Sequence, residues 1–248
     1  PLVKPPRHIN DILTVLDQAG QFDVNVTKRL KSQVSALPPR EGNDKAMADF
    51  YQERGDAARK LGYMKQALDD LRMALIYSDR TGEDDPELLN HLGRVEKSAG
   101  NFQKAVDLLE QSLELRDTVG IYVHLTDAYI KKGDMETAEQ LSREGSDLYV
   151  KKAKKKSRKR QTEKSLLNAE VREVNMSRMR YSVLEAQGKH GEAEQYLRKI
   201  LDFSQSEPVK ERKPRNTINT RIQLSQNLSL QHRLLEAEVE ARQAVKEA

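Results

Sequence analysis

The stretch GRVEKSAGNFQKAVDLLEQSL, residues 93–113, contains a helical run, a Gly with a short polar turn, and a second helical run that opens on Ala. Four other segments have the same order, although His232 replaces the central Gly in the last of them. They are GDAARKLGYMKQALDDLRMAL (55–75), TDAYIKKGDMETAEQLSREGS (126–146), YSVLEAQGKHGEAEQYLRKIL (181–201) and SQNLSLQHRLLEAEVEARQAV (225–245). A helix pair of this kind cannot bury its apolar face alone, so five pairs in phase predict a stacked all-α array.

The positions that the segments share are held by small residues. The turn Gly is Gly62, Gly100, Gly133 and Gly188, and the Ala of the second helix is Ala67, Ala105, Ala138, Ala193 and Ala237. These residues resemble the tetratricopeptide repeat, a helix-turn-helix unit of about 34 residues, and the resemblance implies a right-handed superhelical solenoid. It covers residues 48–248, but the family's closing Pro is missing and its Trp is replaced by Tyr51, Leu89 and Tyr122. The alternative is an ordinary helical bundle in which Gly and Ala are spaced by chance.

The phase of the repeats divides the chain into an N-terminal helical cap, residues 1–45, and an array, residues 46–248. Two shorter helical patterns make up the cap, which we expect to cover the open apolar face of the first repeat. The predicted repeats span residues 48–81, 86–119, 119–150, 174–206 and 218–248, with insertions at 151–171 and 206–216. The second insertion contains two Pro and is predicted to be an exposed loop. Asp85 is predicted to cap a helix that opens at Pro86.

The first insertion carries the basic tract KKAKKKSRKR, residues 151–160. Its cationic residues are Lys151, Lys152, Lys154, Lys155, Lys156, Arg158, Lys159 and Arg160. The chain has 43 Lys and Arg against 39 Asp and Glu, so without these eight the formal charge of +4 becomes −4. Because neither Gly nor Pro occurs between Ser146 and Gln187, the flanking helices are predicted to extend and turn near residues 157–162. A mobile loop is the alternative, since eight like charges repel and have no apolar surface to bury.

Composition and motifs exclude several classes of protein. Cys is absent, which excludes disulfides and thiol catalysis and favours a reducing compartment, so we expect a cytoplasmic protein. No apolar run is long enough for membrane insertion. Catalytic and phosphate-binding motifs are absent, and His91 and His124 have no further ligand at metal spacing, so we expect no enzyme, cofactor or metal. An apolar periodic run at the C-terminus predicts that the chain is cut from a longer protein.

The resemblance implies binding, because partners of this family usually lie along the concave face that the first helices line. Carried over residue by residue, the predicted groove positions are Gln52, Asp56, Arg59, Asn90, Arg94, Lys97, Asp127, Lys131, Asn175, Arg178, Asn219 and Gln226, with Asp49 beside them. A polar lining of both charges suits a peptide or protein segment held by amides and charge pairs. The basic clamp with which some members grip chaperone C-termini is missing, because its positions hold Gln52, Asp56, His91, Gly120 and His124.

Two other functions stay open at this point. The basic tract could bind nucleic acid, with an affinity that falls steeply as salt rises, although no aromatic residue is interleaved in it to stack on bases. The chain could also be the recruiting or regulatory region of a longer enzyme or signalling protein. Stacking of array ends could produce a homo-oligomer, but no residue selects that outcome.

Overall fold

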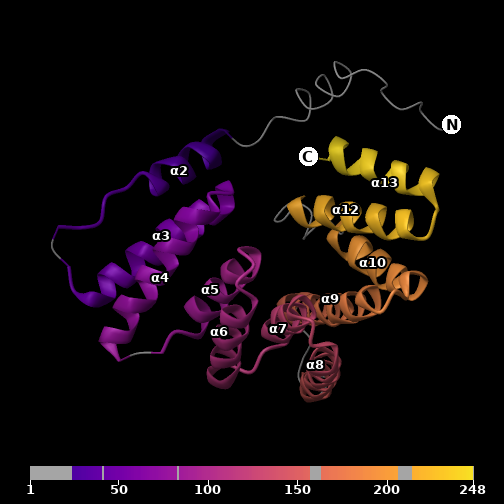
Figure 1. Ribbon diagram of the computed structural model, residues 1–248, viewed down its shortest axis with the longest axis horizontal. Helices are drawn as coiled ribbons and strands as arrows, with labels where there is room; N and C mark the ends of the chain where they lie inside the picture. The colour runs from indigo at the N-terminus through magenta and orange to yellow at the C-terminus, as the bar shows by residue number, and fades with distance from the viewer. Residues whose placement is uncertain (1–23, 41, 83, 157–162, 206–213, 248) are drawn as a thin grey trace. The chain divides into compact units, whose positions relative to one another are not determined.

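The computed structural model describes residues 24–40, 42–82, 84–156, 163–205 and 214–247 (Figure 1). Within these ranges the chain is all-α and contains no strand. The helices are α2 (Val24–Val34), α3 (Asp44–Leu61), α4 (Met64–Thr81), α5 (Pro86–Ser98), α6 (Phe102–Leu115), α7 (Val119–Lys132), α8 (Met135–Lys156), α9 (Glu163–Ala186), α10 (His190–Gln205), α12 (Pro214–Leu230) and α13 (Leu234–Lys246). The predicted fold class is therefore confirmed.

The chain divides into two compact units, with the boundary between α8 and α9. The N-terminal unit contains α2–α8 and the C-terminal unit contains α9–α13. In each unit, helices that follow one another in sequence pack side by side, as α3 and α4 do in Figure 1. The first helices of the pairs are α3, α5, α7, α9 and α12, and the second helices are α4, α6, α8, α10 and α13.

The turn between the two helices of a pair follows the predicted pattern. Gly62, Gly100, Gly133 and Gly188 all have positive φ, between 75° and 91°, a conformation that costs Gly little. His232 adopts φ of 60° at the equivalent position of the last pair, so it keeps the left-handed turn that the other pairs make with Gly. The predicted position of each turn is confirmed.

Small residues let the helices of a pair approach closely. Ala67, Ala105, Ala138, Ala193 and Ala237, which the repeat pattern aligned, are all buried. Gly55 of α3 leaves no room for a side chain, since an added Cβ would lie 2.9 Å from Cγ of Leu71. These contacts explain why the shared positions of the repeats hold residues without long side chains.

The core of the N-terminal unit consists of two clusters of buried residues, one within α3–α6 and one within α6–α8. Leu71, Leu92 and Leu109 are fully buried between successive helices, with the aligned Ala residues around them. The carboxylate of Glu96 is also completely buried, and it accepts hydrogen bonds from Arg72 Nε (2.8 Å) and Asn101 Nδ2 (2.7 Å). Burial alone would raise the pKa of Glu96, but these hydrogen bonds and nearby cationic charges lower it below its ordinary value.

The C-terminal unit combines a smaller core with charged pairs between its helices. Leu197, Leu224 and Leu228 are fully buried where α10, α12 and α13 meet. Arg221 of α12 is buried and forms ion pairs with two carboxylates of the C-terminal region, Glu240 at 2.6 Å and Glu247 at 3.0 Å. The buried guanidinium is therefore compensated by opposite charge on both sides.

Only part of the predicted N-terminal cap lies among the described residues. The second of its two helical patterns forms α2, which packs on α3. The end of this segment is tied to the first pair, because Arg54 donates to the Ala36 carbonyl (2.8 Å) and Gln66 donates to the Val34 carbonyl (2.9 Å). The first pattern, before residue 24, falls outside the described residues.

The bounds of α8, α9 and α12 show where the chain is helical on either side of the two predicted insertions. α8 continues to Lys156 and α9 begins at Glu163, so the helices on both sides of the basic tract extend as predicted, while residues 157–162 lie outside the described ranges. α12 begins at Pro214, so residues 214–216 are helical and the prediction of a loop over all of 206–216 was wrong for them. Pro is well tolerated in the first turn of a helix, and it marks a helix start here.

Candidate functional site

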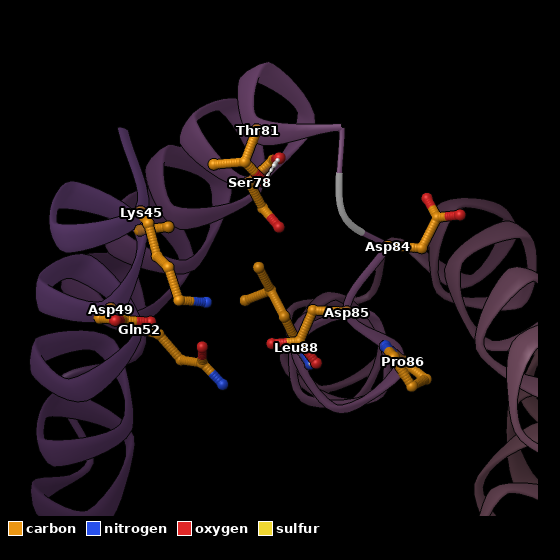
Figure 2. Close-up of a pocket in the computed structure, with 10 residues that line it drawn as sticks. Lys45, Asp49, Gln52, Ser78, Thr81, Asp84, Asp85, Pro86 and Leu88 are labelled. Atoms are coloured by element: carbon orange, nitrogen blue, oxygen red, sulfur yellow. Dashed lines mark hydrogen bonds between the residues drawn. The ribbon is translucent and has the colours of Figure 1, made fainter. Parts of the chain in front are cut away.

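A polar cavity of about 200 Å³ lies in the N-terminal unit, where α3 faces the end of α4 and the start of α5 (Figure 2). Its lining residues are Lys45, Ala48, Asp49, Gln52, Ser78, Thr81, Asp84, Asp85, Pro86 and Leu88. Pockets for drug-sized molecules usually measure about 300–1,000 Å³, so this cavity is too small for them.

Local capping fixes the wall of this cavity on the α5 side. The Asp85 carboxylate accepts hydrogen bonds from the backbone N–H groups of Glu87 (2.8 Å) and Leu88 (3.1 Å), as the Asp-Pro sequence predicted. On the opposite wall, the side chains of Lys45 and Gln52 reach from α3 toward the start of α5 (Figure 2). The cavity therefore presents an ammonium group, an amide and carboxylates at short range.

Ion pairs connect the first helices of successive repeats. Asp56 of α3 lies 3.2 Å from Nδ1 of His91 on α5, and 3.5 Å from Nε of Arg59 on its own helix. Burial would raise the pKa of Asp56, but the nearby His91 and the charge of Arg59 lower it below its ordinary value. His91 thus acts as a link between repeats, a role that the sequence pattern did not indicate.

The next pair of first helices is connected in the same way. The Lys97 ammonium of α5 donates to the Asp127 carboxylate of α7, and both side chains are mostly shielded from solvent. Four residues predicted for the groove, Asp56, Arg59, Lys97 and Asp127, are therefore paired with protein groups. They set a fixed pattern of charge on α3, α5 and α7 and hold these helices together.

Asn90 of α5 differs from these paired residues. Its Oδ1 is buried, and no group in the described part of the chain donates a hydrogen bond to it. A buried acceptor without a donor costs roughly 1–3 kcal/mol, so it has a strong preference for an incoming N–H group. Gln52 and Arg94 are half-buried on α3 and α5, and Lys131 is exposed on α7.

The remaining predicted groove residues belong to the C-terminal unit. Asn175 and Arg178 lie on α9, with Asn175 Oδ1 at 3.5 Å from Arg178 Nη1. Asn219 and Gln226 are exposed on α12. The structure therefore brings Asp56 together with Arg59, Lys97 with Asp127, and Asn175 with Arg178.

The basic tract lies at the end of the N-terminal unit. Lys151 is exposed on α8, and the backbone stays helical through Lys156. Arg158, Lys159 and Arg160 fall outside the described residues. Nucleic-acid binding by the tract therefore stays a prediction.

The sequence pattern missed several residues of the cavity. Lys45 precedes the first predicted repeat, while Ser78, Thr81 and Asp84 lie around the insertion between the first two repeats, where the repeat pattern assigns no groove position. The available signal was the acidic sequence TGEDDP, residues 81–86, directly before a helix start. Its position opposite Asp49 and Gln52 could not be read from helical periodicity.

The described residues contain neither a cluster of metal ligands nor a membrane-spanning helix. No three His, Cys, Asp or Glu side chains gather there in a way that could hold a metal ion. Among the described helices, none is both long and apolar enough to cross a membrane.

Comparison with known sequences identifies the repeat directly in one region. Residues 87–120, which comprise α5, α6 and the start of α7, match the family model described as tetratricopeptide repeat. No curated protein matches the sequence. The matched region coincides with the second repeat that the Gly and Ala spacing predicted, 86–119.

Solved structures of low sequence identity share the fold. NprR in complex with its cognate peptide NprX is 13% identical with a TM-score of 0.61, and the match covers 98% of this chain and 68% of NprR. The apo quorum sensor NprR from B. thuringiensis is 14% identical with a TM-score of 0.55, covering 95% of this chain and 62% of that one. A putative kinesin light chain from Podosopora anserina with nearly identical TPR-like repeats is 18% identical with a TM-score of 0.50, covering 78% and 95%.

Proposed function

We propose that this chain, built from helix pairs of the tetratricopeptide-repeat type, is a protein-interaction scaffold that binds an extended peptide or protein segment along α3, α5 and α7. The observation that carries the proposal is the buried Oδ1 of Asn90, which has no donor among the described residues. An extended segment presents backbone N–H groups at regular spacing, and one of them can supply the missing hydrogen bond.

The charged residues around Asn90 support this mode of binding. Because Asp56 is paired with His91, and Lys97 with Asp127, the groove has little conformational freedom to lose when a segment binds. Backbone-directed recognition by Asn90 then supplies affinity, and the fixed charges select among sequences. NprR, which shares the fold, binds its cognate peptide NprX.

The polar cavity gives the bound segment a place for a side chain. Lys45 and the carboxylates of Asp49 and Asp84 line it, so a polar or charged side chain suits it better than an apolar one. The scaffold itself carries out no chemistry in this proposal. A catalytic or signalling domain elsewhere in a longer chain would use it for recruitment.

Photo-crosslinking tests where a segment binds. Linear peptides that bind the chain would be selected from a random display library and resynthesised with a photoreactive residue at successive positions. The proposal predicts crosslinks to α3, α5 and α7 rather than to α4 and α6. Crosslinks confined to α4, α6 or the basic tract would contradict it.

A further inference from the structure

Arg172, on α9 of the C-terminal unit, has a partly buried guanidinium group that no group in the described part of the chain compensates. Its Nε and Nη2 atoms are buried, and neither meets a hydrogen-bond partner in the part of the chain that the structure describes. A guanidinium group is always charged in proteins and brings five N–H donors, so its burial is unfavourable unless acceptors surround it. The arrangement is costly for the isolated chain.

Arg178 lies six residues further along α9 and is also partly buried. Its Nη1 atom lies 3.5 Å from the neutral Asn175 Oδ1, and within the described ranges no carboxylate lies at ion-pair distance from it. Burial lowers the pKa of Arg178 below its ordinary value, and no neighbouring negative charge offsets that effect. Two cations and one amide therefore lie on a single side of α9, at spacings of three residues.

Two other arginines that are buried or mostly buried have carboxylate partners within the chain. Arg54 pairs with the Asp70 carboxylate at 2.7 Å, and Arg221 pairs with both Glu240 and Glu247. In these cases the fold supplies the opposite charge itself. The contrast indicates that α9 is built to receive its negative charge from outside the chain.

We propose that Arg172, Asn175 and Arg178 form a site for an acidic peptide segment with two carboxylates two residues apart. The inference rests on the proposed role as a scaffold for peptide segments, and it assigns a second site, within the C-terminal unit, beyond the groove on α3, α5 and α7. Arg172 and Arg178 are six residues apart, or about 9 Å along the helix axis. In an extended segment, side chains two residues apart point the same way at about 6.6–6.8 Å, a spacing that two long arginine side chains can match with bidentate ion pairs.

The test measures binding of two labelled peptides to the whole chain at about 0.15 M salt, where exposed charges are screened beyond roughly 8 Å. One peptide alternates Glu and Ala, and its counterpart alternates Gln and Ala. The Glu-Ala peptide is expected to bind at least about tenfold more tightly, and Arg172→Met and Arg178→Met should each remove that preference. Arg180→Met is the matched control, because Arg180 lies two residues beyond Arg178 and therefore projects about 200° around the helix from it.

A second readout does not depend on any peptide. Removal of an uncompensated buried charge should stabilise the free chain, so Arg172→Met is expected to raise its Tm by about 2–4 °C. A lower Tm for this variant would show that Arg172 has a structural partner and would overturn the proposal. Equal stability and an unchanged Glu-Ala affinity would overturn it as well.

Three outcomes separate this site from its alternatives. If inorganic phosphate displaces the peptide at equal concentration, the site takes a single small anion and the two-carboxylate proposal fails. If substitution of the tract lysines, but not of Arg172, abolishes binding of the Glu-Ala peptide, the basic tract is responsible. If library-selected peptides still require Asn90 while both arginine variants behave like the unmodified chain, the groove function stands and the α9 site fails.

Discussion

Gly93 of α5 packs against Leu109 of α6 so closely that a Cβ added at Gly93 would lie 2.8 Å from Leu109 Cγ. Leu109 is fully buried, so it has no open space into which it can move. The contact fixes the distance between the two helices of the second repeat. It also explains why this position of the repeat is Gly rather than a residue with higher helix propensity.

Substitution of Gly93 by Ala should therefore destabilise the fold. Overpacking costs about 1–3 kcal/mol and the gain in helix propensity is about 1 kcal/mol, so we expect a net loss of up to about 2 kcal/mol in the free energy of unfolding. Gly191→Ala on α10 is the control, because its added Cβ would lie no closer than 3.8 Å to Gln231 Oε1. Urea denaturation of both variants checks the prediction, and equal stability would contradict the packing argument.

The Glu96 carboxylate should make stability depend on pH. The pKa of Glu96 in the folded chain is below the ordinary value. Its contribution to the free energy of unfolding is therefore complete above the pKa of Glu in the unfolded chain, about 4.3, and is lost as the pH falls through the lower pKa of the folded chain. Glu96→Gln should lower the free energy of unfolding by about 1.5–3 kcal/mol at pH 7 and by much less at pH 3. Thermal unfolding between pH 7 and pH 3 measures this. Glu114→Gln, at an exposed position of α6, should show no such convergence.

The ion pair between Lys97 and Asp127 should couple the second and third repeats. A double-mutant cycle with Lys97→Met and Asp127→Asn is expected to give a coupling energy of about 0.5–1.5 kcal/mol, because both side chains are largely shielded from solvent. The free energies of unfolding of the four proteins supply the cycle. A coupling energy near zero would mean that the pair does not stabilise the groove.

The basic tract should be dispensable for groove binding. Replacing the lysines of its helical part, residues 151–156, with Gln is expected to change the affinity of a library-selected neutral peptide by less than about twofold at roughly 0.15 M salt, since screening limits distant charges. Fluorescence anisotropy measures the affinity. A loss of binding in this variant would move the functional surface from the groove to the tract.

The repeat architecture could be predicted because few residue types satisfy its backbone and packing demands. The left-handed turn at Gly62 or Gly133 favours Gly, and the crossing at Ala67 or Ala105 admits only a small side chain. These constraints leave a periodic signal in the sequence. The match of residues 87–120 to the tetratricopeptide repeat has the same origin.

The details of the site could not be predicted in the same way. Periodicity places Asp56 and Lys97 on the first helices, but their pairing with His91 and Asp127 depends on side-chain rotamers and on the offset between repeats. Arg172 lies between the predicted insertion, residues 151–171, and the fourth predicted repeat, residues 174–206, so the repeat pattern assigns it no position. Its lack of a partner became visible only from the packing around α9.

The affinity of a library-selected peptide for the Asn90→Ala variant tests the proposed groove on α3, α5 and α7 most directly. Since Oδ1 of Asn90 has no donor in the described part of the free chain, the substitution should leave the free energy of unfolding unchanged or raise it slightly. The Kd of the peptide should rise at least about tenfold, or ~1.4 kcal/mol, because a hydrogen bond to the bound backbone is lost. An unchanged Kd in a folded Asn90→Ala protein would contradict the proposed groove.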